Sequence, residues 1–174
     1  MPVDIDPVGL SIRLERPDDI AAIRELLASA FESPLEANLV DRLRQDGDLV
    51  LSLVAELDGK LAGYAGFSRL RIQGQAGRAT GLAPVAVRKC FRRRGIAAAL
   101  IRTGLARLAE AGEEIVFVLG NPDYYRKLGF DAALARHFDA PWSGPAFMAR
   151  ALDRPRDATD RPKVDYPPAF NVFG

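Results

Sequence analysis

Alternation of apolar and polar residues predicts several strands along the chain. Successive side chains of a half-buried strand point to opposite faces, so apolar residues recur at every second position. Segments with this alternation, or with a short apolar run, are Leu10–Glu15, Leu82–Val87, Glu114–Gly120 and Pro145–Leu152. The longer stretch Asp48–Ile72 predicts two strands around a turn at Asp58-Gly59, because Asp-Gly is a strong hairpin signal. Its first arm is nearly all apolar, which indicates a central strand covered on both faces.

Apolar residues spaced three or four apart predict helices between these strands. Pro17, followed by Asp18 and Asp19, favours the start of a helix that continues through Ala30. The other predicted helices follow Ser33-Pro34, span Ile96 to Ala111, and occupy NPDYYRKLGF up to Gly129. The segment Gln73–Gly81 has the composition of a loop, and residues 153–174 form a proline-rich tail that these periods do not place.

The order of these elements, β-α-α-β-β-β-α-β-α-β, predicts an α/β fold with a mixed sheet. A length of 174 residues favours a single domain, expected to span residues 1–174 with its core at about 10–152. Apolar residues make up 48% of the chain and charged residues 27%, as in ordinary globular proteins.

The composition also limits the cellular setting. One cysteine, Cys90, rules out an internal disulfide and fits a reducing compartment. The chain has no apolar run of the roughly 18–20 residues that a membrane helix needs, and its acidic N-terminus does not resemble a signal peptide. We therefore expect a cytoplasmic protein that binds no membrane. The sequence also lacks a His, Cys and Asp cluster of the kind that binds metal, so no metal is expected.

Positive charge is concentrated just before one predicted helix. Five cationic side chains lie within the seven residues Arg88–Arg94, although the net charge of the chain is only +1. Gly95 and the helix start follow directly, and a helix N-terminus offers unpaired N–H groups and partial positive charge to an anion. Gly95 and the small Ala97 leave the backbone accessible. The segment therefore predicts a phosphate-bearing ligand. A nucleic-acid module is the less favoured alternative, because the charge is local and lacks interleaved aromatic residues.

Pro84 lies in the middle of the strand before this cluster. Proline has no N–H to donate to a neighbouring strand, so its position favours an edge strand or a bulge. A bulge would move the strand away from its next neighbour and leave the peptide groups of Val85 and Val87 available. A ligand that carries amides could pair with them as an added strand does.

The chain has neither the G-x-x-x-x-G-K-[ST] loop of ATP-binding proteins nor G-x-G-x-x-G after a strand. RRRGIA, residues 92–97, matches Q/R-x-x-G-x-G/A and resembles the coenzyme A pyrophosphate loop of the GNAT superfamily of N-acetyltransferases. NPDYYRKLGF also resembles this superfamily, in which an Asn follows the fifth strand and a Tyr stands four residues before Gly-Phe. SPLEANLVDRLR, LAPVAV and PAFMARAL look most like its predicted acetyltransferases of the YhbS-like branch.

The resemblance covers roughly residues 10–152 and implies a central, mostly antiparallel sheet that splays between its fourth and fifth strands, with helices on both faces. It also implies acetyl-CoA as co-substrate. The residues it places at the coenzyme are Val85, Ala86, Val87, Arg92, Arg93, Arg94, Gly95, Ile96, Ala97, Asn121 and Tyr125. Asn121 has the alternative role of capping its helix.

The implied reaction is direct transfer of an acetyl group from coenzyme A to a primary amine of a small molecule or a peptide. The N–H of Val85 is the candidate donor to the oxyanion, and Tyr125 the candidate acid for the departing sulfur. Tyr124, about 100° away on the helix, is predicted to be a packing residue. The third and fourth strands carry no carboxylate, so the candidate bases are Glu36, Glu32 or a chain of water molecules.

Several alternatives stay open at this level. A catalytically idle domain that senses acyl-CoA would keep the loop at residues 92–97 and need no base. His137 and Cys90 lack the partners that catalysis would need, and Trp142 could line an acceptor pocket or hold the tail. The identity of the amine and the choice between monomer and homodimer are not determined by the sequence.

Overall fold

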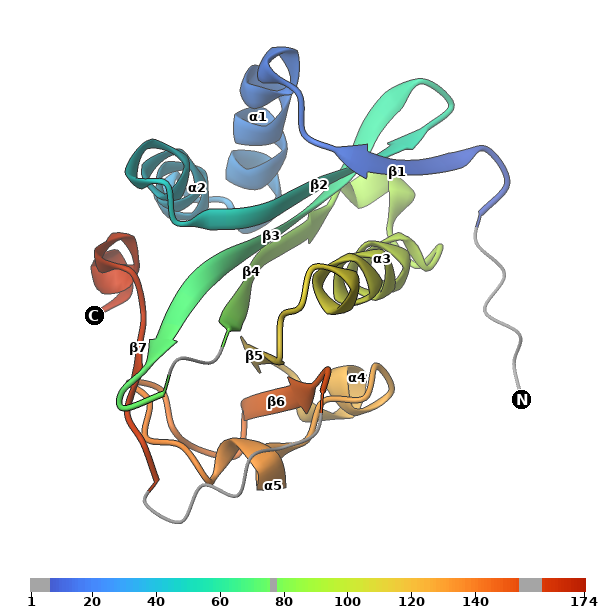
Figure 1. Ribbon diagram of the computed structural model, residues 1–174. Helices are drawn as coiled ribbons and strands as arrows, with labels where there is room; N and C mark the ends of the chain where they lie inside the picture. Colours follow the sequence, from blue (N-terminus) through green and yellow to red (C-terminus); the bar gives the residue numbers. More distant parts are fainter. Residues whose placement is uncertain (1–6, 76–77, 154–160) are drawn as a thin grey trace.

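Seven strands form one sheet that runs through the middle of the molecule (Figure 1). The computed structural model describes residues 7–75, 78–153 and 161–174. Six strands follow one another in chain order: β1 (Leu10–Leu14), β2 (Leu49–Leu57), β3 (Lys60–Ile72), β4 (Ala79–Val87), β5 (Ile115–Leu119) and β6 (Phe147–Ala151). The pair β4–β5 is parallel and the other pairs are antiparallel, which confirms the predicted mixed sheet. The short β7 (Val164–Asp165) pairs with the end of β3.

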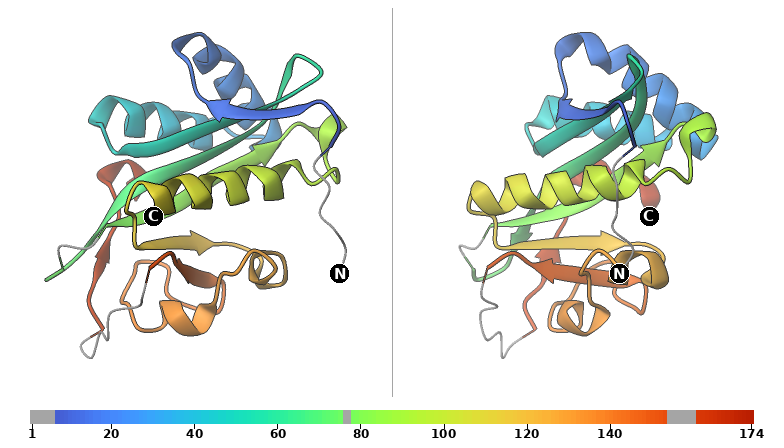
Figure 2. Two further views of the ribbon diagram at one scale, coloured as in Figure 1. Left: turned by 45° about the vertical axis from the view of Figure 1, so that its right-hand side comes forward. Right: turned by 90° about the vertical axis from the view of Figure 1, so that its right-hand side faces the viewer.

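Helices cover both faces of this sheet. In Figure 1, α1 (Ile20–Phe31) and α2 (Leu35–Asp46) lie above the sheet and α3 (Ile96–Glu110) lies below it, an arrangement that Figure 2 shows from two further sides. The short helices α4 (Pro122–Arg126) and α5 (Ala132–Ala135) connect β5 to β6. Single 3-10 turns are η1 (Pro17–Asp19), η2 (Lys89–Phe91) and η3 (Pro168–Phe173).

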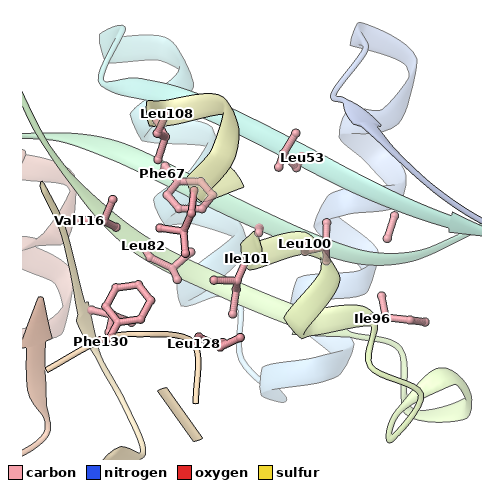
Figure 3. Close-up of a cluster of buried hydrophobic side chains, with 14 of the residues drawn as sticks. Leu53, Phe67, Leu82, Ile96, Leu100, Ile101, Leu108, Val116, Leu128 and Phe130 are labelled. Atoms are coloured by element: carbon pink, nitrogen blue, oxygen red, sulfur yellow. The ribbon is translucent and has the colours of Figure 1, made fainter. Parts of the chain in front are cut away.

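The helix α3 is held against the sheet by a continuous apolar core. Leu100 and Ile101 are fully buried and pack with Phe67 and Leu53 of the neighbouring strands (Figure 3). The ring of Phe67 lies where a Cβ atom of Gly104 would be, so glycine at this position lets the helix approach β3 closely. This packing fixes the N-terminal end of α3 relative to β4.

Most strand and helix predictions agree with the structure, and the hairpin turn is a clear case. Asp58 and Gly59 have φ angles of 51° and 74°, the left-handed pair that a tight hairpin turn needs. The predicted loop at Gln73–Gly81 is wrong in its last residues, because β4 already begins at Ala79. Ala79 and Gly81 pair with both β3 and β5, and the small residues that looked like a turn fit a crowded central strand.

The strand β4 contains a bulge on its β3 side and separates from β5 over its second half. Ala83 and Pro84 together lie opposite the single residue Gly66 of β3, so Pro84 marks a bulge and not a sheet edge. Beside β5, pairing stops at Leu82 opposite Val118, although β4 continues to Val87. The sheet therefore splays between β4 and β5, as expected, and the second half of β4 has a neighbour only on its β3 side.

The C-terminal segment, which sequence periodicity left unplaced, packs against the sheet and α2. Val164 is fully buried and pairs with Ile72 of β3. Phe170 in η3 is 5% exposed and belongs to one apolar cluster with Leu39 and Leu43 of α2. Residues 161–174 thus build one wall beside the bulge of β4, and α5, β7 and η3 are elements that the sequence analysis did not foresee.

Candidate functional site

Two cavities meet at the bulge of β4. The first, here called the loop cavity, has a volume of about 440 Å³. It lies between the second half of β4, the segment that leads into α3, and the end of α1. Its lining residues are Ala30, Phe31, Val85, Ala86, Val87, Phe91, Arg92, Arg93, Gly95, Ile96, Ala97, Ala98 and Tyr124. It therefore contains eight of the residues predicted to hold the coenzyme: Val85–Val87, Arg92, Arg93 and Gly95–Ala97.

The backbone turns its N–H groups toward this cavity where α3 begins. Arg93 and Gly95 both have left-handed φ angles, 62° and 78°, and such residues form concave nests of N–H groups. The first intrahelical bond runs from the N–H of Ala99 to the carbonyl of Gly95, so the preceding N–H groups have no partner within the helix. Nothing lies within 4 Å of the Cβ position of Gly95, which leaves space for an anion. This arrangement, built mainly from backbone groups, suits an anion.

The cationic side chains around the loop have different roles. The Nε of Arg92 donates to the carbonyl of Val87 at 3.1 Å, so Arg92 bridges the loop and β4. The guanidinium of Arg94 lies 5.7 Å from the ring centre of Phe91, and Arg94 does not line the loop cavity. Arg88 and Lys89 form ion pairs with the α1 region, to Glu25 at 3.5 Å and Glu32 at 3.2 Å. Through these ion pairs, the cationic segment Arg88–Arg94 also connects the loop before α3 to α1.

The second half of β4 presents peptide groups to the gap. The N–H of Arg88 donates to Ala62 of β3. Since neighbouring residues of a strand point their peptide groups to opposite sides, those of Val85 and Val87 face away from β3. Val85 lines both cavities, as does Phe31. The carbonyl of Val87 already accepts from Arg92, so an extended ligand with amides can pair with the N–H groups of Val85 and Val87 and with the carbonyl of Val85.

The second cavity, here called the aromatic cavity, has a volume of about 540 Å³ and lies on the other side of Val85. Six of its thirteen lining residues are aromatic. The lining residues are Phe31, Glu36, Leu39, Leu82, Ala83, Pro84, Val85, Leu119, Tyr125, Trp142, Tyr166, Phe170 and Phe173. They come from the α1–α2 region, the β4 bulge, the end of β5 with α4, the loop before β6 and the C-terminal segment, so only the folded chain brings them together.

One carboxylate reaches the aromatic cavity. Glu36 stands in the first turn of α2, and its Oε2 is buried without a hydrogen-bond partner in the described part of the chain. Glu32, the other candidate base, is directed elsewhere, because it ends α1 with a φ of 52° and pairs with Lys89. Its side chain is 78% exposed. Of the two carboxylates, the structure brings only Glu36 to the cavity.

Tyr125 lines the aromatic cavity near the end of β5. Its ring lies over Gly120, where a Cβ atom would overlap it, and makes an edge contact with Phe130 at 5.7 Å. Burial raises the pKa of the Tyr125 phenol to about 12, so the group holds its proton. The prediction that Tyr124 is the packing residue was wrong. Tyr124 is 37% exposed and lines the loop cavity, because glycine at position 120 makes room for Tyr125 instead.

The remaining candidate residues from the sequence analysis lie at other positions in the structure. The side chain of Asn121 accepts from the N–H of Asp123 at 2.9 Å and caps α4, and Asn121 lines neither cavity. His137 and Cys90 are exposed and also line neither. Trp142 lines the aromatic cavity, and its ring centre lies 4.7 Å from that of Tyr166 in the C-terminal segment, which it helps to hold.

The sequence analysis missed the remaining walls of the aromatic cavity. Tyr166, Phe170 and Phe173 are spaced four and three apart in the tail, a signal for one apolar face that the surrounding prolines obscured. Among the described residues, no group of three or more His, Cys, Asp or Glu side chains is arranged to hold a metal ion. Within the same ranges, no helix combines the length and the apolar character needed to cross a bilayer.

Comparison with known proteins identifies the family. Residues 11–133 match the family model described as the acetyltransferase (GNAT) domain. The chain belongs to the GNAT acetyltransferase family. It is 42% identical over 167 residues to the uncharacterized N-acetyltransferase YhbS of Escherichia coli K12, a match that covers 93% of this chain and 99% of YhbS.

Solved GNAT structures share the whole fold. The crystal structure of YhbS from Escherichia coli in complex with CoA superposes with a TM-score of 0.86 at 39% identity, covering 98% of this chain and 97% of that one. A GNAT family acetyltransferase from Brucella melitensis in complex with acetyl-CoA gives 0.79 at 36% identity, covering 93% of this chain and 98% of that one. These comparisons confirm the family and fold that the loop at residues 92–97 indicated.

Proposed function

We propose that this protein is an N-acetyltransferase that moves an acetyl group from acetyl-CoA to a primary amine by direct attack. The observation that carries the proposal is the position of Val85 between the two cavities. On one side are the N–H groups and cations that suit a diphosphate, and on the other a partly open cavity with a carboxylate and a phenol. A thioester at Val85 would be exposed to an acceptor in the aromatic cavity.

The loop cavity suits coenzyme A in each of its parts. The N-terminal turn of α3 and the loop before it suit the diphosphate, with Arg92 and Arg93 at the same cavity. The N–H of Val87 and the carbonyl of Val85 suit the amides of the pantetheine arm, which leaves the N–H of Val85 for the thioester oxygen. Relatives of the same family are crystallised with CoA and with acetyl-CoA, which supports the same donor for this chain.

The transfer then proceeds with the following proton movements. Glu36 takes a proton from the incoming ammonium, since an amine with a pKa of about 10.4 is only about one part in a thousand neutral at pH 7. The amine nitrogen attacks the thioester carbonyl carbon, a C–N bond forms, and the N–H of Val85 donates to the oxygen that gains charge. As the C–S bond breaks, Tyr125 gives its phenolic proton to the sulfur. The amide nitrogen loses its second proton, which returns to Tyr125 through water, and Glu36 releases its proton to solvent.

The proposal is tested with purified protein in two steps. Calorimetry with acetyl-CoA measures donor binding, and release of the coenzyme A thiol is followed after a panel of primary amines is added. We expect donor binding and thiol release that depends on the amine, with the acetylated amine identified by mass spectrometry. Donor binding without thiol release from any amine would contradict the enzymatic function and favour the idle sensor.

A further inference from the structure

The aromatic cavity carries a single formal charge. Among its lining residues, Glu36 is the one side chain that is charged at neutral pH, and no Lys, Arg, His or Asp is present. Around it stand the rings of Phe31, Trp142 and Phe173, together with Tyr125, Tyr166 and Phe170. The buried Oε2 of Glu36 has no protein partner in the described ranges, although buried carboxylate oxygens are normally paired.

This composition favours one kind of ligand. Aromatic faces attract a cation through the negative charge of their π-systems, and a carboxylate adds one ion pair. A second positive charge would find no second carboxylate, and losing its water shell without a partner is unfavourable. Many hydroxyl groups would likewise meet mostly rings and aliphatic side chains. A volume of about 540 Å³ also suits a small molecule.

We propose that the acceptor is a small monoamine, one ammonium group on an apolar alkyl or arylalkyl body, held between Glu36 and the aromatic wall. This inference rests on the proposed function, since it concerns the acceptor of the same transfer. It disfavours polyamines and aminoglycosides, which carry several charges. The amine is paired by Glu36 on binding, and the same carboxylate then accepts its proton.

The C-terminal segment acts as the specificity-determining wall in this arrangement. The half-buried Tyr166 and the buried Phe170 pack against Trp142, with ring centres 4.7 and 6.1 Å from that of Trp142, and form the inner part of the wall. Phe173 is 39% exposed and lines the cavity at its outer side, so its replacement leaves the core intact. The neighbouring Val172 is 52% exposed and does not line the cavity, which makes it a matched control.

The test compares three ligands with the same six-carbon chain: hexylamine, 1-hexanol and 1,6-diaminohexane. Each is titrated by calorimetry into the protein saturated with coenzyme A, which has no acetyl group to transfer, so binding is measured without turnover. We expect hexylamine to bind about tenfold more tightly than 1-hexanol, because the alcohol lacks the charge. The diamine is expected to bind about tenfold more weakly than hexylamine, because its second charge is unpaired.

Two variants separate the carboxylate from the rings. Glu36→Gln should bring the affinities for hexylamine and 1-hexanol to within about threefold of each other, since the ion pair is lost. Phe173→Leu keeps an apolar side chain but removes one π face, and should weaken hexylamine about threefold while leaving 1-hexanol unchanged. Val172→Leu should change neither ligand.

The outcomes distinguish this inference from the proposed function. Equal affinity for hexylamine and 1-hexanol, tighter binding of the diamine, or no binding of hexylamine would overturn the monoamine acceptor, whether or not acetyl transfer occurs. Failure to bind coenzyme A would instead contradict the proposed function, and the ligand preference is then measured on the protein alone. If the protein binds hexylamine selectively but does not acetylate it from acetyl-CoA, the preference for a monoamine holds and the proposed enzymatic function is contradicted.

Discussion

The two cavities that meet at Val85 are built by different means. The loop cavity is made largely from one continuous stretch, residues 85–98, and its chemistry lies in backbone N–H groups and nearby cations. The aromatic cavity draws side chains from five separate parts of the chain and has one carboxylate among rings. A local sequence can therefore specify the cavity proposed for the donor, whereas the cavity proposed for the acceptor depends on tertiary packing and can change with a few side chains.

The largest effect is expected from a substitution in the loop cavity that changes the affinity for acetyl-CoA. Gly95→Glu puts a side chain at a φ of 78° and a negative charge where the diphosphate is proposed to bind. Strain and repulsion together should weaken acetyl-CoA binding by about 100-fold or more, measured by calorimetry. The matched control is Gly47→Glu, because Gly47 has a φ of 75°, is equally unobstructed, and lies at the end of α2 away from both cavities. Equal losses of affinity in the two variants would show that strain alone is responsible.

Tyr125→Phe should affect chemistry and leave donor binding intact. Loss of the phenolic proton is expected to lower kcat about 100-fold, while the affinity for acetyl-CoA stays within about twofold. Tyr124→Phe is the control, since Tyr124 is the adjacent tyrosine but lines the loop cavity. Steady-state kinetics with a saturating amine gives both values. A normal kcat in Tyr125→Phe would remove Tyr125 from the role of acid.

Glu36→Gln should impair the acceptor side in a way that depends on pH. At pH 7 most of a simple amine is protonated, so we expect kcat/KM for the amine to fall about 30-fold without its proton acceptor. The deficit should shrink toward about pH 10, where the amine loses its proton unaided. Glu32→Gln is the control, because Glu32 is exposed and paired with Lys89. A deficit that is the same at all pH values would indicate a purely structural effect.

The last prediction concerns kcat of the unmodified protein as a function of pH, where we expect little change over a wide range. Burial raises the pKa of Tyr125 to about 12, so the phenol stays protonated where an ordinary tyrosine, with a pKa of about 10, is half ionised. The acid form is lost only as the pH rises through the raised value. We therefore expect kcat to stay level from about pH 9 to about pH 11. A falling limb centred near pH 10 would contradict a buried acid.

The same contrast explains how much of the molecule could be predicted from its sequence. The strand–loop–helix unit around Gly95 follows from local signals: a proline at the bulge, left-handed residues, and an amphipathic helix. Glu36 could be proposed only by elimination. The structure adds the reason, a buried oxygen at the aromatic cavity.

The part of the aromatic cavity formed by the C-terminal segment could not be predicted from local sequence patterns. Phe170 and Tyr166 lie in a proline-rich stretch without a regular period, and their burial depends on β7 pairing with β3, more than ninety residues away in the chain. The error at Ala79–Gly81 has a related cause. Small residues in a central strand look like a turn until the neighbours that crowd them are known.

The divergence of β4 from β5 has a consequence for solubility. Unpaired peptide groups at the outer border of a sheet invite strands of other molecules and promote aggregation. Here the N–H groups of Val85 and Val87 that face away from β3 lie inside the sheet, between β4 and the end of β5 and close to α3. A foreign strand has no outer border to extend at this place. The second half of β4 can thus stay without a partner strand on its β5 side and still not offer a border that a strand of another molecule could extend.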